Sequence, residues 1–309
     1  MDYQALFSSK TGTAVEMPAG PLTPPKYVFS VTYADPDSLS SQWFSEAMQN
    51  AVDREGRDLA AYPPTQGHVG MRELICHNLK ARRDLDAEVD STFLTSGAGG
   101  AIQSILDLLV DPGDIVLVEE FCYLGTIKML LQRRAKVIHV PTDDQGMQTD
   151  ALETIIRDLQ SEKQRPKLIY TIPVYHNPMG MTLSLERRVH MVEISHKYQV
   201  PILENESYAD FRIDGPTIPH TLMGIDDQDS VMYVSAYTKL IGCGLRLGYA
   251  VVPKPIIAKL AEVDFGPSPS HLATMTVHDY LKNHMNDHIA RVRDSLTTKR
   301  TTMLEALEE

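Results

Sequence analysis

Cysteine is scarce in this sequence, with three residues among 309: Cys76, Cys122 and Cys243. An odd number of cysteines at wide spacing excludes a disulfide framework, and it does not match a cysteine metal-binding motif. Free thiols in a chain of this size are typical of a reducing compartment. We therefore expect a cytoplasmic protein without a bound metal.

The sequence also lacks a long hydrophobic run. No stretch reaches the roughly 18 apolar residues that a membrane-spanning helix needs. The N-terminal segment, which begins MDYQALFSSK, has no basic start followed by an apolar core. This excludes a secretory signal, and we expect a soluble protein with no membrane contact.

Basic residues are few relative to acidic ones, with 29 Lys and Arg against 41 Asp and Glu and a formal net charge of −12. This balance argues against nucleic acid or an anionic membrane as the main partner, because like charges repel. A small ligand is the more compatible partner. A local basic pocket for a phosphate group needs only a few side chains, so the net charge does not argue against one.

From residue 92 onward, segments with the patterns of strands and helices alternate. Short apolar runs predict strands at residues 92–95, 115–119, 137–141, 167–173, 201–204, 230–234 and 247–252. Helices are expected at residues 41–51, 71–84, 99–110, 123–134, 150–160, 184–198, 255–263, 271–283 and 285–309. Repeated βαβ units indicate an α/β fold with a mostly parallel sheet. Ligands in such sheets bind beyond the carboxyl ends of the strands.

Residues 1–40 are rich in Pro, Gly, Ser and Thr and show no sustained periodicity. We expect an N-terminal arm that wraps on the body of the protein or on a neighbouring subunit. The main domain is expected to cover residues 41–283, and residues 284–309 are expected to form one long helix.

The stretch VSAYTKLIGCGLRLGY, residues 234–249, joins two apolar runs that we interpret as buried parallel strands. It carries Lys239 and Arg246 among three glycines. An ammonium group at the end of a buried strand is costly unless it is paired or neutralised. Schiff-base chemistry neutralises such a lysine and favours one whose pKa is lowered by burial, and the planar fork of Arg246 suits a phosphate. The alternative is that Lys239 reaches solvent and Arg246 forms a surface ion pair.

Two further motifs lie where a parallel sheet would place a ligand. Residues 96–100 (SGAGG) open a helix, and the exposed N–H groups there form a ready anion site. A tight turn between strand and helix would equally require the glycines. Residues 176–180 (HNPMG) follow the strand at 167–173, although Asn-Pro is also a common start of a turn.

In their order, these motifs resemble the fold-type I aminotransferases that use pyridoxal 5′-phosphate (PLP), class I/II. Within that class they are most similar to the 2-aminoadipate and aromatic aminotransferases. The resemblance extends from Tyr62 to the C-terminus. It implies a three-layer αβα fold, PLP as the cofactor, an amino acid and a 2-oxo acid as substrates, and a homodimer.

The resemblance also assigns residues to the lysine and phosphate sites. Lys239 would form the Schiff base and, once displaced, act as the base that shuttles a proton. The backbone of residues 98–100 (Ala98, Gly99 and Gly100) would hold the cofactor phosphate together with Arg246, joined by Ser235 or Thr238.

Other positions match the residues that surround the cofactor ring in this family. Tyr123 would stack on the pyridine ring, and Asn177 and Tyr208 would hydrogen-bond its phenolic oxygen. Tyr62 would reach the phosphate across the dimer interface.

Asn205 departs from the family, which usually has Asp at this position to pair with the protonated pyridine nitrogen. An amide does not compensate that charge, so the ring should be a weaker electron sink. Glu204 or Glu206 is an alternative partner for the nitrogen in a different register, although strand alternation points at least one of them elsewhere.

This departure leaves alternatives to transamination open. One is a PLP-dependent lyase, such as a C–S or β-eliminating enzyme, and another is a non-catalytic PLP-binding paralogue or fragment. A third is the sensor module of a transcription regulator, but the arm before Ser41 is too short for the winged-helix domain that precedes such modules.

Family members usually continue beyond the long helix into a C-terminal domain of about 100 residues, which supplies the arginine for the substrate carboxylate. The sequence ends at Glu309. We therefore expect the C-terminal small domain to be largely absent, with residues 284–309 as the helix that leads to it. Either the chain is a fragment, which we favour, or the carboxylate is bound in another way.

Overall fold

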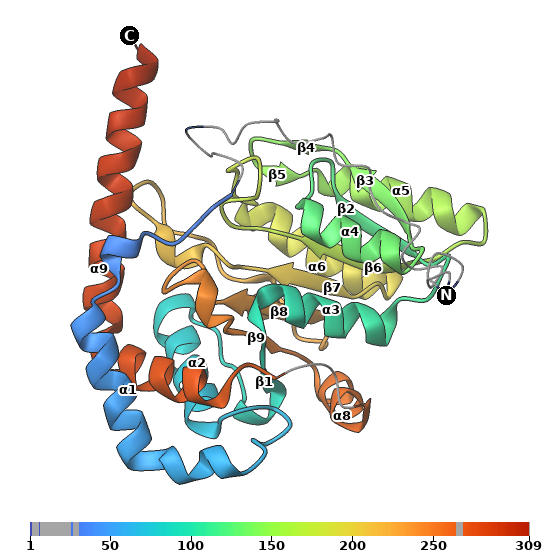
Figure 1. The fold of residues 1–309 in the computed structure, drawn as a ribbon. Helices are drawn as coiled ribbons and strands as arrows, with labels where there is room; N and C mark the ends of the chain where they lie inside the picture. The colour runs from blue at the N-terminus through green and yellow to red at the C-terminus, as the bar shows by residue number, and fades with distance from the viewer. Residues whose placement is uncertain (2–5, 7–25, 27–30, 264–267, 309) are drawn as a thin grey trace.

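The computed structural model describes residues 1, 6, 26, 31–263 and 268–308. Its centre is a sheet with the strand order β1-β9-β8-β7-β6-β2-β3 (Figure 1). The strands are β1 (Thr92–Thr95), β2 (Ile115–Glu119), β3 (Lys136–Val140), β6 (Pro166–Thr171), β7 (Ile202–Asn205), β8 (Val231–Ala236) and β9 (Gly248–Val251). Each of the seven expected strands is present, with bounds within two residues of those predicted.

Most neighbouring strands are parallel, as the alternation of strands and helices predicted. The pairs β2–β3, β2–β6, β6–β7 and β7–β8 are parallel. The prediction that residues 247–252 form another parallel strand was wrong, because β9 is antiparallel to both β8 and β1. The turn between β8 and β9 is too short for the crossover that a parallel pair requires.

Helices cover both faces of the sheet, which gives the three-layer αβα arrangement. The helices are α1 (Ser41–Glu55), α2 (Val69–Arg83), α3 (Gly97–Leu109), α4 (Leu124–Gln132), α5 (Thr149–Ser161), α6 (Leu185–Tyr198), α7 (Leu222–Ile225), α8 (Lys254–Val263) and α9 (His271–Glu308). Side chains of α3, α4 and α8 pack on one face, and those of α2, α5, α6, α7 and α9 pack on the other.

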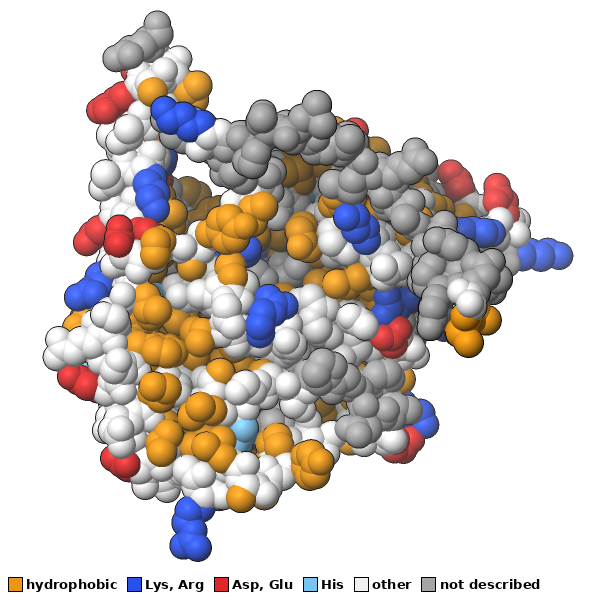
Figure 2. Space-filling model, viewed as in Figure 1, with side chains coloured by type: hydrophobic (Ala, Val, Ile, Leu, Met, Phe, Trp, Pro, Cys, Tyr) orange, Lys and Arg blue, Asp and Glu red, His pale blue; other side chains and the backbone are white. Residues whose placement is uncertain are grey.

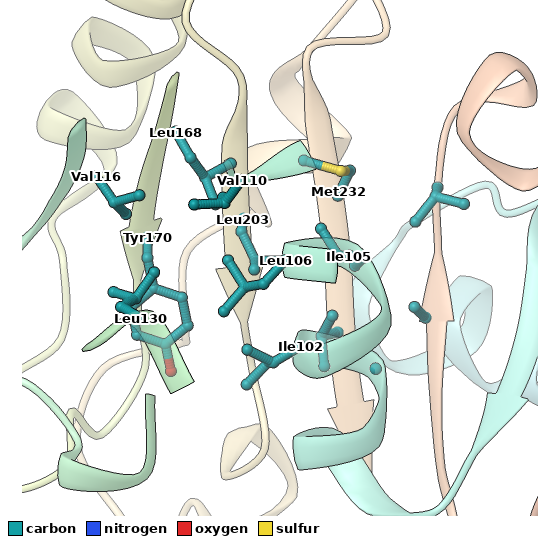
Figure 3. Close-up of a cluster of buried hydrophobic side chains, with 14 of the residues drawn as sticks. Ile102, Ile105, Leu106, Val110, Val116, Leu130, Leu168, Tyr170, Leu203 and Met232 are labelled. Atoms are coloured by element: carbon teal, nitrogen blue, oxygen red, sulfur yellow. The ribbon is translucent and has the colours of Figure 1, made fainter. Parts of the chain in front are cut away.

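The first of these faces contains a continuous apolar core. The apolar stripe of α3 places Ile102, Ile105 and Leu106 against the sheet, beside Tyr170 and Leu130 (Figure 3). The strands beneath are apolar on both faces, as expected where helices cover a parallel sheet from both sides. This core fixes the start of α3 and the ends of the central strands, where the candidate site lies.

Helix α9 is continuous, whereas the sequence predicted two helices with a break near residue 284. Polar residues around that position resemble the end of a helix. In the fold, however, the ring of His284 stacks on Trp43 of α1 with centroids 4.4 Å apart, and the Asn283 side chain bonds the Asp279 carbonyl one turn earlier at 2.9 Å. Packing between α1 and α9 therefore outweighs the local signal (Figure 1).

Some short elements were not predicted from the sequence. The strands β4 (Thr142–Asp143) and β5 (Gly146–Met147) form a two-stranded hairpin, and α7 is a single turn of helix. Strands of two residues and a single turn of helix carry too little periodicity to be predicted. Within the described ranges, no helix is long and apolar enough to cross a membrane.

The predicted N-terminal arm lies mostly outside the described residues. Its described end, residues 31–40, runs beside α9 and passes over the body (Figure 1). Asp35 contacts Ser295 and lies 3.4 Å from the ammonium of Lys299, both on α9. This end of the arm is thus wrapped on the chain's own body.

Candidate active site

The predicted motifs gather at the carboxyl ends of the parallel strands and at the start of α3. Tyr123 follows β2, Asn177 follows β6, Asn205 ends β7 and Lys239 follows β8. Residues 96–100 follow β1 at the same edge of the sheet. The topology therefore brings together motifs that lie far apart in the sequence.

The turn into α3 forms a cradle with two side chains from the segment after β8. Arg246 donates from Nη2 to the Ser96 carbonyl at 2.9 Å. Gly97 has φ +76°, and a Cβ there would lie 3.1 Å from Arg246 Nη2 and 3.4 Å from Thr238 Oγ1. Thr238 Oγ1 is buried and has no hydrogen-bond partner within the described residues. A free hydroxyl, a guanidinium and the N-terminus of a helix fit the oxygens of a phosphate group.

A cavity of about 360 Å³ borders this cradle and includes Gly99, Gly100 and Arg246 in its lining. Ala98 lies in the same first turn of α3 but not in the cavity lining. Ser235 is buried, and its hydroxyl donates to the Glu206 carbonyl at 2.9 Å. Of the two hydroxyls that the resemblance left open, that of Thr238 is the one available for a phosphate.

Gly248 is a residue of the cradle whose role the sequence reasoning missed. A Cβ at this position would lie 2.4 Å from the Gly97 carbonyl carbon and 2.7 Å from the Ala98 nitrogen. Strand β9 therefore passes directly under the turn that begins α3. The signal in the sequence was a third glycine after Lys239.

Lys239 is half-buried, and its ammonium donates to the Thr32 carbonyl at 2.5 Å. It lines a cavity of about 420 Å³ between the arm, the segment 208–214 and α9. Apolar side chains gather on this face of the molecule beside α9 (Figure 2). We expected the end of a buried strand to bury the Lys239 amine. Instead, the amine is covered by the arm and not by the sheet.

A histidine of α9 binds the backbone directly after Lys239. His288 of α9 is fully buried, and its Nε2 lies 2.7 Å from the Leu240 carbonyl, where it donates. Its Nδ1 lies 2.9 Å from the Tyr280 hydroxyl. Burial lowers the pKa of His288, in keeping with a neutral ring that donates at one nitrogen and accepts at the other.

Asn177 and Tyr208 are in contact, as expected for two residues that share one ligand atom. Asn177 Nδ2 donates to the Tyr208 hydroxyl at 3.3 Å, and burial raises the pKa of Tyr208. Tyr175, two residues before Asn177, has φ +46°. Such a conformation is uncommon for a residue other than glycine and is typical of functional sites. Tyr123 lies at the start of α4 and is 44% exposed.

Asn205 is held in the sheet by two hydroxyl groups. Its Nδ2 donates to the Tyr170 hydroxyl at 3.0 Å, and its Oδ1 accepts from Ser207 Oγ at 2.8 Å. Tyr170 belongs to the core beneath α3 and α4. Asn205 therefore faces the same side of the sheet as the anion cradle.

The two neighbouring carboxylates point away from Asn205, so neither takes its place. Glu204 accepts from the backbone N–H groups of Leu222 and Met223 at 2.8 and 3.0 Å. Glu206 accepts two hydrogen bonds from Arg83, at 2.7 and 2.9 Å. Burial, with the charge of Glu206, raises the pKa of Glu204 to about 7. From the sequence, Glu204 and Glu206 stayed open as alternative partners for the pyridine nitrogen. They are excluded because side chains alternate along β7, so both lie on the face opposite to Asn205.

Tyr62 lies apart from this site. Its side chain is fully exposed and contributes to neither cavity described above. A role at the cofactor phosphate therefore requires a second chain, as the resemblance implied.

Comparison with known proteins places the chain among aminotransferases. The sequence model of the family "Aminotransferase class I and II" matches residues 32–309. The chain is 25% identical over 277 residues to aromatic-amino-acid aminotransferase 1 of Thermococcus litoralis, which covers 89% of this chain and 66% of that protein. It is 27% identical over 252 residues to YisV, an uncharacterized HTH-type transcriptional regulator of Bacillus subtilis, which covers 80% of this chain and 50% of that protein. The chain thus spans between half and two thirds of the length of these two relatives.

A solved structure shares the whole described fold. The crystal structure of kynurenine aminotransferase from Pyrococcus horikoshii, in complex with PMP, aligns with a TM-score of 0.90 at 25% identity. The alignment covers 100% of this chain and 78% of that one. It confirms the predicted three-layer αβα fold of the PLP-dependent transferases.

Proposed function

The chain belongs to the family of class I and II aminotransferases, and on that premise we propose that it moves an amino group between an amino acid and a 2-oxo acid with PLP as cofactor. The observation that carries the proposal is the adjacency of two sites. Thr238 contributes a free buried hydroxyl to the anion cradle, and the next residue, Lys239, presents its amine to a neighbouring cavity. A ligand with a phosphate and an aldehyde a few bonds apart fits both.

Each side chain has a distinct task in this proposal. Arg246, Thr238 and the start of α3 hold the phosphate, with Ala98, Gly99 and Gly100 as backbone donors. When bound, the cofactor serves as the electron sink for the substrate's Cα. The amine of Lys239, once free, would take the proton from Cα and return it two bonds away, to the cofactor's former aldehyde carbon on the other side of the amino nitrogen.

The remaining residues are proposed to orient the cofactor ring. Tyr123 packs on the ring, and the amide of Asn177 donates to its phenolic oxygen beside Tyr208. Asn205 faces the ring nitrogen and offers it a hydrogen bond but no charge. The ring is therefore a weaker electron sink than one paired with Asp.

We propose Arg300 of α9 as the residue that holds the substrate carboxylate. It lines the cavity of Lys239 together with Lys299. One of its terminal nitrogens pairs with Asp214 at 2.5 Å, while its Nε is buried without a partner within the described residues. A guanidinium with an unused donor fits a carboxylate.

The test begins with tag-free protein incubated with PLP and then reduced with borohydride. Mass spectrometry of the digest is expected to find the cofactor on Lys239. Lys239→Ala should abolish the labelling, whereas Lys254→Ala, which removes an exposed lysine paired with Glu88, should leave it intact. A second sample of the PLP-loaded protein is left unreduced and given an amino acid and a 2-oxo acid. It should release a new amino acid over many turnovers. Labelling of a different lysine, or no product with any donor, would contradict the proposal.

The similarity to an HTH-type regulator favours one second candidate, a module that binds PLP and senses a ligand without turnover. Both candidates predict labelling of Lys239. Only the aminotransferase predicts multiple turnovers, so the same experiment separates them. No finding favours the lyase alternative.

We further propose that the protein is a cytoplasmic homodimer. The full exposure of Tyr62 supports a contact with a partner chain, and the three free cysteines support a reducing compartment. Light scattering after gel filtration should give twice the mass of the chain. Tyr62→Ala should weaken PLP binding about tenfold if its hydroxyl donates to the partner's phosphate. The division into an arm, a main domain at 41–283 and a helix at 284–309 remains a prediction.

A further inference from the structure

A buried carboxylate and a buried imidazole face each other behind the turn that carries Asn177. Glu119, at the end of β2, and His176 are each 2% exposed. Glu119 Oε2 lies 3.6 Å from His176 Nε2, and neither atom has a hydrogen-bond partner within the described part of the chain. Buried polar atoms are almost always paired, so two unpaired atoms that face each other require an explanation.

The other atoms of the two side chains define which of their atoms accept and which donate. Glu119 Oε1 accepts from the Thr171 hydroxyl at 2.5 Å and from the Ile172 N–H at 2.8 Å, so this oxygen acts as an acceptor only. His176 Nδ1 accepts from the Met179 N–H at 3.3 Å. A neutral ring that accepts at Nδ1 carries its proton on Nε2, the atom that lies 3.6 Å from Glu119 Oε2.

His176 is also the centre of the turn. Its N–H donates to the Met181 carbonyl at 2.8 Å, and its carbonyl accepts from the Gly180 N–H at 2.6 Å. Asn177 is the next residue, so the position of the imidazole determines where the Asn177 amide lies.

We propose that Glu119 and His176 are positioning residues: the carboxylate binds the Nε2–H of His176 and so holds the Asn177 amide against the phenolic oxygen of the cofactor. The inference rests on the proposed function, because it gives Asn177 a bound PLP to act on. It adds two buried residues, on β2 and in the turn, to the machinery of the site.

The titratable side chains around Glu119 do not compete with its contact to His176. Cys122 and Tyr170 are two titratable side chains that interact electrostatically with Glu119, and burial raises the pKa of both. Both are therefore neutral near pH 7 and place no charge beside the contact between Glu119 and His176.

Two substitutions isolate the contact. Glu119→Gln keeps an oxygen for Thr171 and Ile172 but turns an N–H toward the N–H of His176. His176→Asn keeps an acceptor near the position of Nδ1 for the Met179 N–H, but removes the donor to Glu119. The matched control is Glu120→Gln, an adjacent exposed carboxylate that accepts from the Thr142 N–H at 3.2 Å.

The readout is the pH titration of the visible absorbance of bound PLP. An amide that donates to the phenolic oxygen favours its ionised form, so a displaced Asn177 should raise the pKa of this transition. We expect a rise of about 0.5 to 2 units for either variant, and for the double variant a rise no larger than for one alone. Glu120→Gln should titrate like the wild type.

An unchanged titration in both variants with PLP still bound would overturn the inference, as would shifts that add up in the double variant. If the wild type shows no PLP band at all, the proposed function has failed instead. The same double-mutant cycle on urea unfolding then still measures the contact, and zero coupling between Glu119 and His176 would overturn the inference. Should Glu119→Gln not fold, His176→Asn reports on the same contact.

Discussion

Gly248→Ala tests whether β9 supports the anion cradle. The added methyl group would lie 2.4 Å from the Gly97 carbonyl carbon and 2.7 Å from the Ala98 nitrogen. Both are backbone atoms, so no side-chain rotation relieves the contact. Either β9 moves away from the start of α3, or the turn that holds the phosphate moves.

The size of the effect follows from the kind of contact. An extra methyl group in a packed interior usually destabilises a protein by about 1–3 kcal/mol, and we expect the free energy of unfolding to fall within that range. If the turn moves, Gly97 and Ala98 no longer face Arg246 correctly. The loss of one charge-assisted hydrogen bond to the phosphate then weakens PLP binding roughly 10- to 100-fold.

Urea unfolding of the apoprotein measures the first quantity, and PLP titration followed by absorbance measures the second. The control is Gly244→Ala, because a Cβ there has no atom within 4 Å. That variant should change stability by less than about 0.5 kcal/mol. If Gly248→Ala matches it in both assays, β9 does not support the cradle and the reasoning is refuted.

Three further predictions concern single side chains around the site. Asn205→Asp should raise the rate of transamination, because a carboxylate strengthens the electron sink if it faces the ring nitrogen; an unchanged rate with bound PLP would place residue 205 elsewhere. Burial lowers the pKa of His288 in the folded chain, so the unfolded chain takes up the proton first as the pH falls. The contribution of His288 to stability is therefore complete above about pH 6.5 and is lost below that pH. His288→Gln should flatten the decline in unfolding free energy below pH 6.5, and an identical slope would contradict this. Arg300→Gln should raise KM for the amino acid about 10- to 100-fold with a smaller change in kcat, and an unchanged KM would exclude Arg300 from carboxylate binding.

The elements that were predictable are those with a strong local pattern. Strand β2 is an unbroken apolar run between polar segments, and its bounds match the prediction. The helix at residues 41–55 begins where expected because the Ser40 side chain accepts from the Trp43 N–H. The glycines of residues 97–100 and the Asn-Pro pair at 177–178 indicated the site because their backbone requirements are visible in the sequence.

Other features depend on contacts between distant residues, which no local pattern encodes. The direction of β9 depends on the short turn after Lys239, and the continuity of α9 depends on packing against Trp43. The Thr32 carbonyl reaches Lys239 across 207 positions of sequence, and His288 reaches Leu240 across 48. A buried histidine on a long polar helix gives no sign of its partner.

The surroundings of Asn205 limit the chemistry of the site more firmly than the substitution alone. Arg188 is fully buried and lies 3.6 Å from Glu204 and 3.4 Å from Glu206. If either carboxylate turned toward the ring nitrogen, Arg188 would lose part of its compensation, and removing one partner of a buried ion pair costs about 3–5 kcal/mol. The ion pairs that stabilise the end of β7 therefore prevent Glu204 and Glu206 from taking the place of the Asn205 amide. The site therefore works with an amide at the position where the family usually has a carboxylate.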